Sequence, residues 1–220
     1  METLTEAREK ILAEITSDDP HTRREYLARF DADARSFSEF MAKAWMSWRS
    51  LDDSIGKNQE LAHVSGLVYT AITLQIQSMK LFLSGYTVAA GNMFRQVLES
   101  LALGLLCSSK RKNFLRRFID DQYSSNIAVR DVLRHAAELG VNKDGLRVLK
   151  EARDFYSKYS HPTKLTIASV IPFSGKGVYV AASFDEDTIF AYEKEISTRL
   201  GLAKTFPSFI VAVKLNVEKW

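Results

Sequence analysis

Three polar residues near the middle of the chain have a spacing that brings them onto one side of a helix. Asn92, Arg95 and Glu99 follow one another at steps of three and four residues, and residues at such steps are neighbours on a helix surface. Many of the surrounding residues are apolar, among them Val97 and Leu98. A buried charge is costly unless it is paired. Arg95 and Glu99 can pair with each other, but each keeps further hydrogen-bonding capacity, so we expect a partner from another helix.

A second polar stripe follows later in the chain. Arg153, Ser157 and His161 recur at steps of four, with Lys158 beside them. Histidine can act as a general acid or base, and a neighbouring arginine or lysine can stabilise charge on a phosphate. Pro162 disfavours a helical conformation in the residue before it, which places His161 at or just beyond a helix end. A histidine there also interacts favourably with the helix dipole, and this is the structural alternative.

The charge of the chain is unevenly distributed. A net charge of +3 hides a net of +8 over residues 61–180, which hold 16 basic and 8 acidic residues. The densest group of cations is Lys110, Arg111, Lys112, Arg116 and Arg117. Such a cluster is typical of a surface that attracts phosphates, and together with Lys158 it forms the predicted nucleic-acid-binding surface. The alternative is the solvated face of a helix, partly balanced by nearby aspartates.

Helical periodicity accounts for most of the chain. Apolar residues recur at three- and four-residue steps, which predicts helices over residues 4–15, 20–51, 58–83, 86–107, 109–139 and 143–160. The segment 86–107 is apolar around most of its circumference, as expected of the central helix of a bundle. Glycines mark two of the predicted helix ends, at Gly85 and Gly140.

The last part of the chain has a different pattern. Residues 166–184 are rich in β-branched residues on both sides of a glycine-containing turn at 174–177, which predicts a two-stranded hairpin. A final helix is expected over residues 185–220, kinked or divided at Pro207. The predicted fold class is mainly α, a bundle of long antiparallel helices with one small β-hairpin inserted before the C-terminal helix. Because no linker separates two parts, residues 1–220 are expected to form a single helical domain.

Part of this sequence resembles a known group of proteins. The segment LFLSGYTVAAGNMFRQVLES, followed later by FYSKYSHPT, is similar to uncharacterised prokaryotic helical proteins related to the HEPN superfamily. The resemblance places a HEPN-like core at about residues 58–165. It implies a helical bundle, often a homodimer, of the kind found in toxin–antitoxin pairs, abortive-infection proteins and other antiviral systems. Many members are metal-independent endoribonucleases, whose signature is an arginine and a histidine on one helix, separated by four to six residues.

The chain departs from that signature, because seven residues separate Arg153 from His161. If the site is catalytic, the resemblance implies RNA cleavage by the RNA's own 2′-hydroxyl group, with His161 as general acid or base. Arg153, Lys158 or Arg95 would stabilise charge on the phosphate, and Glu99 would orient His161 or Arg95.

Three hypotheses for the function follow. The leading one is a HEPN-like interaction or nucleic-acid-binding protein, in a prokaryotic defence or toxin–antitoxin-type system. The first alternative is a metal-independent endoribonuclease that uses His161. The second is a purely structural oligomer in which the buried polar residues fix the helix register.

The composition excludes several other classes. A hydrophobic fraction of 46% excludes a disordered chain, and a lone cysteine, Cys107, excludes an internal disulfide and is expected to be an inert core thiol. Glu60 and His63 resemble half of a di-iron site but lack the other ligands, so we expect no metal and no cofactor. The N-terminal residues carry no secretory signal. We therefore expect a cytoplasmic protein without a membrane partner, which binds RNA or another nucleic acid, a second copy of itself or a partner protein.

Overall fold

The computed structural model describes residues 3–16, 20–110, 113–171 and 182–220, and all regular secondary structure in these ranges is helical. The elements are α1 (Leu4–Thr16), α2 (Pro20–Ile55), α3 (Gln59–Phe82), α4 (Thr87–Cys107), α5 (Phe114–Ile119), α6 (Ser125–Arg134), α7 (Lys143–Tyr156), the 3-10 helix η2 (Ser157–Ser160), α8 (Lys164–Ala168), the 3-10 helix η3 (Glu186–Thr188) and α9 (Ile189–Val217). The predicted helical bundle is therefore present.

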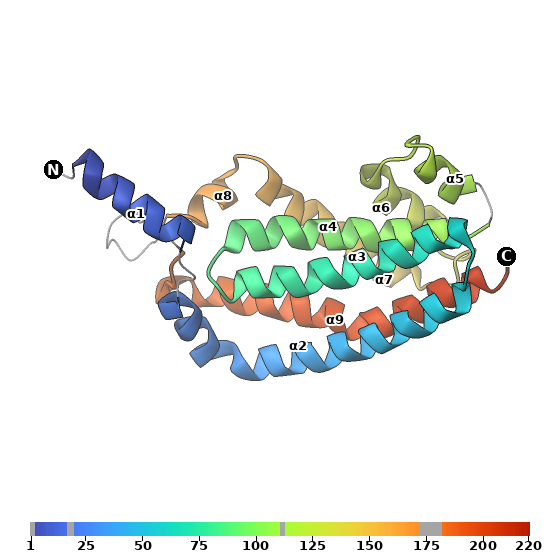
Figure 1. The fold of residues 1–220 in the computed structure, drawn as a ribbon, viewed down its shortest axis with the longest axis horizontal. Helices are drawn as coiled ribbons and strands as arrows, with labels where there is room; N and C mark the ends of the chain where they lie inside the picture. Colours follow the sequence, from blue (N-terminus) through green and yellow to red (C-terminus); the bar gives the residue numbers. More distant parts are fainter. Residues whose placement is uncertain (1–2, 17–19, 111–112, 172–181) are drawn as a thin grey trace.

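Four long helices, α2, α3, α4 and α9, form the body of the molecule, as Figure 1 shows. α3 packs along α4, α9 packs along α2, and α6 and α7 both contact α4. Apolar side chains from these helices form one continuous core. The short helices α5 and α8 lie toward opposite ends of the bundle (Figure 1).

α4 is the helix around which the others pack. Its residues from Leu101 to Cys107 are all buried, as expected of a helix that is covered on every side. The predicted central helix is thereby confirmed. One charged residue of α4, Glu99, is buried among these apolar side chains.

The predicted end of α3 is confirmed at Gly85. Gly85 has a φ of +82°, a conformation that glycine adopts without steric cost. The Tyr86 N–H donates to the Leu81 carbonyl at 3.0 Å, and the Gly85 N–H donates to the Phe82 carbonyl at 2.9 Å. These two bonds satisfy carbonyls that the helix end would leave unpaired.

The prediction of one continuous helix over residues 109–139 is wrong. Asn113 and Asp121 both have a φ of +55°, and they bound α5 on either side. Asparagine and aspartate tolerate this left-handed conformation better than other non-glycine residues. The Gln122 N–H donates to the Arg117 carbonyl at 2.7 Å, so an aspartate ends α5 much as a glycine ends α3.

The predicted β-hairpin is also wrong, because the described residues contain no strand. Its first residues, 166–168, belong to α8, and residues 169–171 and 182–184 are not extended into a ladder. The predicted turn at residues 174–177 lies outside the described residues.

Two threonines explain why the first predicted strand is helical. Thr163 accepts a hydrogen bond from the Thr166 N–H at 3.2 Å, which is the usual cap of a helix N-terminus. The Thr166 hydroxyl lies 3.0 Å from the Lys158 carbonyl oxygen and 2.8 Å from that of His161. Their β-branched side chains thus cap a helix and close a turn, a local alternative that threonine hydroxyls offer the backbone.

The last two predicted helices need smaller corrections. The segment 143–160 is α7 followed by the tighter η2, and His161 is extended, with φ −134° and ψ 153°. α9 continues through Pro207 without a division.

α9 is also the one described helix long and apolar enough to cross a membrane, over residues 186–217. This is weak evidence for a span, because the core helix of a soluble protein passes the same test. Arg199, Phe206 and Asn216 of α9 are buried inside the bundle.

α1 is attached to the bundle differently from the other helices. None of its residues is buried, and Figure 1 shows it projecting beyond one end of the molecule. The Tyr86 hydroxyl donates to Glu14 Oε1 at 2.9 Å. Leu4 and Ile15 remain largely exposed.

Gly91 marks a close approach of η2 to α4 and gives a test of the packing. A Cβ at Gly91 would lie 2.5 Å from Cδ2 of Tyr159. We expect Gly91→Ala to lower the free energy of unfolding by about 1–3 kcal/mol in urea denaturation, because the overpacked side chains must shift. Gly201→Ala on α9 is the control, since a Cβ there meets nothing within 4 Å and alanine favours helix. Equal losses in both variants would contradict this packing.

Candidate functional site

The predicted polar residues of α4 form the centre of a hydrogen-bonded network. The Glu99 side chain is only 7% exposed, and its Oε1 accepts from Arg95 Nε at 2.9 Å and from Arg153 Nε at 3.3 Å. Its Oε2 accepts from the Ser125 hydroxyl at 3.1 Å. The expected partner from another helix is therefore confirmed, and it is Arg153 of α7, joined by Ser125 of α6. A buried carboxylate with three donors avoids much of the cost of burying a charge.

Arg95 connects this centre to η2. Its Nη1 donates to the Ser160 hydroxyl at 2.5 Å, and that hydroxyl donates to Asn92 Oδ1 at 2.6 Å. Asn92 Nδ2 in turn donates to the Tyr159 carbonyl at 3.1 Å. Asn92, Arg95 and Glu99 therefore lie on one face of α4, as their spacing predicts. Their hydrogen bonds fix the position of α7 and η2 against α4.

Arg153 and Ser157 are held by their own neighbours. Arg153 donates from Nη2 to Asn126 Oδ1, and its Nη1 lies 3.4 Å from Asp154 Oδ1. The Ser157 hydroxyl donates to the Arg153 carbonyl at 2.9 Å, so it is already used within the helix. Because α7 tightens into η2 at this point, the predicted stripe of Arg153, Ser157 and His161 does not continue as one regular helix.

His161 does not belong to the network around Glu99. Its side chain is exposed and has no hydrogen bond or ion pair with the residues that the structure describes, while its carbonyl accepts from Thr166. Among the described contacts Glu99 orients Arg95 and Arg153, not His161. The catalytic role predicted for Arg95, Glu99, Arg153 and His161 stays a prediction.

The network can offer hydrogen-bond donors to an anion at one edge. The Arg95 side chain is 26% exposed, and its Nη2 has no partner among the described residues. Arginine presents its donors in a fixed planar fork that matches a phosphate. Arg95 donates from Nη1 to Ser160, which is the residue before His161 in the chain.

The basic cluster predicted for nucleic-acid binding is partly neutralised within the fold. Arg116 pairs with Asp120 at 3.1 Å, and the Arg117 guanidinium lies 4.9 Å from the centre of the Tyr123 ring. Lys110 is exposed, and Arg111 and Lys112 lie outside the described residues. Other cations of the basic segment are also paired with carboxylates, namely Arg130 and Arg134 with Asp131, Arg147 with Asp144, and Lys150 with Asp154.

The cations around η2 and α8 behave differently. Lys158, His161, Lys164 and Lys194 are exposed, and none has an ion pair with a carboxylate in the described part of the chain. Lys158 Nζ lies 5.4 Å and Lys194 Nζ 5.7 Å from the centre of the half-buried Phe155 ring. We call the three lysines, with His161 and Phe155, the η2 surface. Because η2 is followed by α8, at the other end of the bundle from α5 (Figure 1), Lys158 does not share a patch with the Lys110–Arg117 cluster.

A second buried charge, which the sequence analysis does not predict, lies on α9. Arg199 is fully buried and donates from Nη1 to Glu195 Oε2 at 2.5 Å and from Nε to Ser78 Oγ at 3.1 Å. The hydroxyls of Tyr156 and Tyr159 also donate to Glu195, at 2.9 and 3.3 Å. Burial raises the pKa of both tyrosines above the ordinary value, so they remain hydrogen-bond donors. An arginine four residues after a glutamate was the available signal, but such pairs are also common on exposed helices.

Two further expectations can be compared with the structure. Cys107 is buried, and burial raises the pKa of its thiol to about 12, so it is a poor nucleophile at neutral pH. Among the described residues no group of three or more His, Cys, Asp or Glu side chains is placed to hold a metal ion.

The network around Glu99 generates a prediction about stability. We expect Glu99→Gln to lower the free energy of unfolding by about 2–4 kcal/mol, because both arginines lose their shared carboxylate. Urea denaturation followed by circular dichroism measures this change. Glu151→Gln, an exposed change on α7, should alter the stability by less than about 0.5 kcal/mol. A Glu99→Gln protein as stable as the control would show that the network is not a structural requirement.

In the comparisons with known proteins, no family model, no curated protein and no solved structure gave a match to this chain.

Proposed function

We propose that this protein binds single-stranded RNA through the phosphate backbone at the η2 surface. The observation that carries the proposal is the distribution of unpaired cations. Several cations of the basic segment are engaged by aspartates, whereas Lys158, His161, Lys164 and Lys194 are exposed without a carboxylate partner in the described residues. Unpaired cations attract phosphates, and their binding releases counterions from the nucleic acid.

The η2 surface also has an aromatic component. Phe155 lies between Lys158 and Lys194, within 6 Å of both ammonium groups. Proteins that bind single strands combine cations along the backbone with aromatic side chains on which bases stack. The free Nη2 of Arg95, which also donates from Nη1 to Ser160, adds a further donor.

The backbone under this surface is held firmly in place. The carbonyls of Lys158 and His161 both hydrogen-bond the Thr166 hydroxyl, and the neighbouring Ser160 is bonded to Arg95 and Asn92. Cations on a preorganised backbone lose less conformational entropy when they bind a ligand.

The choice of RNA draws on the resemblance of residues 60–165 to HEPN-related proteins, many of which act on RNA. The same resemblance favours a role in a prokaryotic defence or toxin–antitoxin-type system, as a homo-oligomer or with a partner protein. These parts of the proposal depend on the resemblance and not on the cations.

The test measures how RNA affinity changes with salt. We expect a fluorescently labelled single-stranded RNA to bind in EDTA, with anisotropy giving the affinity at several salt concentrations. For a single strand the slope of log K against log salt is about −0.7 for each phosphate contact. The Lys158→Ala/Lys164→Ala double variant should therefore have a slope smaller by about 1.4 and bind at least about tenfold more weakly near physiological salt.

The matched control removes two cations that are already paired. Arg116→Ala/Lys150→Ala makes the same change of charge, and we expect it to leave the slope nearly unchanged. An equal loss in both double variants would refute the η2 surface, and so would an RNA affinity of the unaltered protein that is insensitive to salt. Unlabelled DNA of the same sequence, added as a competitor, tests the preference for RNA.

The same samples, run on a denaturing gel, test the catalytic alternative. Intact RNA supports a binding protein. RNA that is cut in EDTA by the unaltered protein, but not by a folded His161→Ala variant, would replace the binding proposal with the endoribonuclease.

A further inference from the structure

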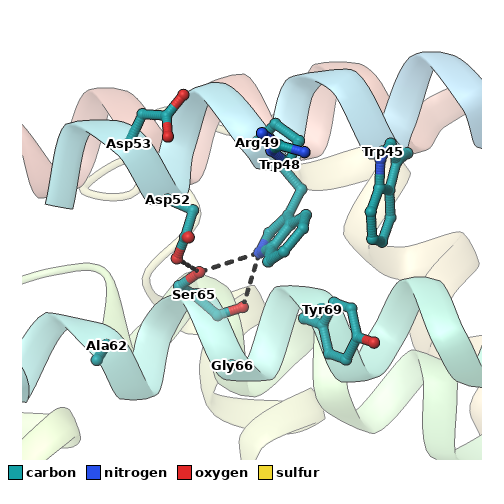
Figure 2. A pocket seen from close by; sticks show the side chains of 9 residues that line it. All are labelled: Trp45, Trp48, Arg49, Asp52, Asp53, Ala62, Ser65, Gly66 and Tyr69. Atoms are coloured by element: carbon teal, nitrogen blue, oxygen red, sulfur yellow. Dashed lines mark hydrogen bonds between the residues drawn. The ribbon is translucent and has the colours of Figure 1, made fainter. Parts of the chain in front are cut away.

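A cavity of about 610 Å³ opens between α2 and α3, on a part of the bundle that the proposed RNA site does not use. Figure 2 shows its lining. This cavity is wide open to solvent, so a ligand bound in it would stay partly exposed. The lining residues are Trp45, Trp48, Arg49, Asp52 and Asp53 of α2, and Ala62, Ser65, Gly66 and Tyr69 of α3.

Three aromatic rings form one wall of this cavity. The centres of the Trp45, Trp48 and Tyr69 rings lie 4.8, 5.0 and 6.0 Å apart, and the rings are tilted against one another by 44–56°. The wall is therefore curved and not a flat stack. Trp45 is 38% exposed and Tyr69 43% exposed, a large apolar area for helices that bury most of their other aromatic residues.

A serine fixes one ring relative to a carboxylate. The indole N–H of Trp48 donates to the Ser65 hydroxyl at 3.0 Å, and that hydroxyl donates to Asp52 Oδ1 at 2.6 Å. The dashed lines in Figure 2 mark this chain of bonds. Asp52 keeps its second oxygen free of protein partners in the described residues, as Asp53 keeps both of its own. The aromatic wall and the acidic end of the cavity are thus held at a fixed separation.

The opposite side of the cavity is open because its residues are small. A Cβ added at Gly66 would meet nothing within 4 Å, and Ala62 lies one turn earlier on α3. One cation, Arg49, also lines the cavity, so the lining carries two carboxylates against one guanidinium. The sign of the charge favours a cationic ligand.

We propose that this cavity binds a small organic cation with a methylated ammonium group, held against the exposed faces of Trp45 and Tyr69 with Asp52 as the counter-charge. The face of an aromatic ring carries negative potential, which attracts cations. Tryptophan binds cations more strongly in this way than tyrosine or phenylalanine does. A methylated ammonium is a good match, because it has few or no N–H groups that would require hydrogen-bond acceptors in the wall. The carboxylates at the end of the wall supply long-range attraction.

The first experiment compares choline with its uncharged carbon analogue, 3,3-dimethylbutan-1-ol, by isothermal titration calorimetry. The two molecules have nearly the same shape, so the difference in affinity reports the charge. We expect choline to bind at least about tenfold more tightly. Equal affinities, or no binding of choline, would overturn the proposal.

Variants then locate the site. Tyr69→Leu and Trp45→Leu should each weaken choline binding about three- to thirtyfold. Phe190→Leu, a change at an aromatic residue of α9 that is 72% exposed, should not. Asp52→Asn should weaken binding, and Arg49→Gln should strengthen it by removing the competing cation. Weaker choline binding by Arg49→Gln would identify an anion site and refute the proposal. Melting temperatures identify any variant that does not fold. If Tyr69→Leu or Trp45→Leu fails to fold, the choline affinity of the other variant tests the proposal.

The failure of this proposal can be distinguished from the failure of the RNA proposal. Tyr69→Leu should bind RNA as the unaltered protein does, because the cavity lies on α2 and α3. Lys158→Ala/Lys164→Ala should bind choline normally for the same reason.

Discussion

The arrangement of the bundle depends on one buried carboxylate. Glu99 lies on α4, which packs against α3, α5, α6, α7, η2 and α9, and an unpaired charge would be too costly to bury there. Two arginines and a serine from three different helices converge on it. Because a carboxylate accepts hydrogen bonds only in certain directions, the helices that supply these donors have little freedom to slide or rotate. Apolar packing brings the helices together, and Glu99 selects which side of α6 and of α7 faces α4.

A second buried ion pair holds the same segment from the other side. In residues 153–160, Arg153 and Ser160 hydrogen-bond to side chains of α4. Tyr156 and Tyr159 of the same segment donate to Glu195 of α9. Residues 153–160 are thereby bonded to both α4 and α9, through different side chains. Its exposed residues, Lys158 among them, project from a backbone with little conformational freedom. Buried polar groups of this kind can specify one arrangement over its competitors even when they add little stability.

The parts of the fold that could be predicted from the sequence are those in which one local signal dominates. Gly85 ends a helix because only a residue without a side chain takes that φ without cost, and the apolar circumference of residues 101–107 requires a central position. Asn113 and Asp121 carry weaker signals, since both residues are also common inside helices. Thr166 misled the prediction of a strand, because a side chain that favours β-structure can equally form local hydrogen bonds with the backbone.

The candidate sites were harder to predict, because they depend on side chains far apart in the sequence. Helical spacing predicts that Arg95 and Glu99 lie on one face of their helix. Nothing in the sequence indicates that Arg153 and Ser125 also donate to the Glu99 carboxylate. Trp45 lies on α2, whose apolar residues recur at helical spacing. Periodicity gives the direction of an apolar stripe but not its width, and the structure places Trp45 at the stripe's exposed edge.

The attachment of α1 has a consequence for what counts as the folded unit. No residue of α1 is buried, so its apolar side chains contribute almost nothing to the core that stabilises the other helices. The cooperative unit therefore begins at α2, and α1 can fray without a cost to the bundle. In hydrogen-exchange terms, the amides of α1 would exchange through local opening, while those of α4 would exchange only when the whole bundle unfolds.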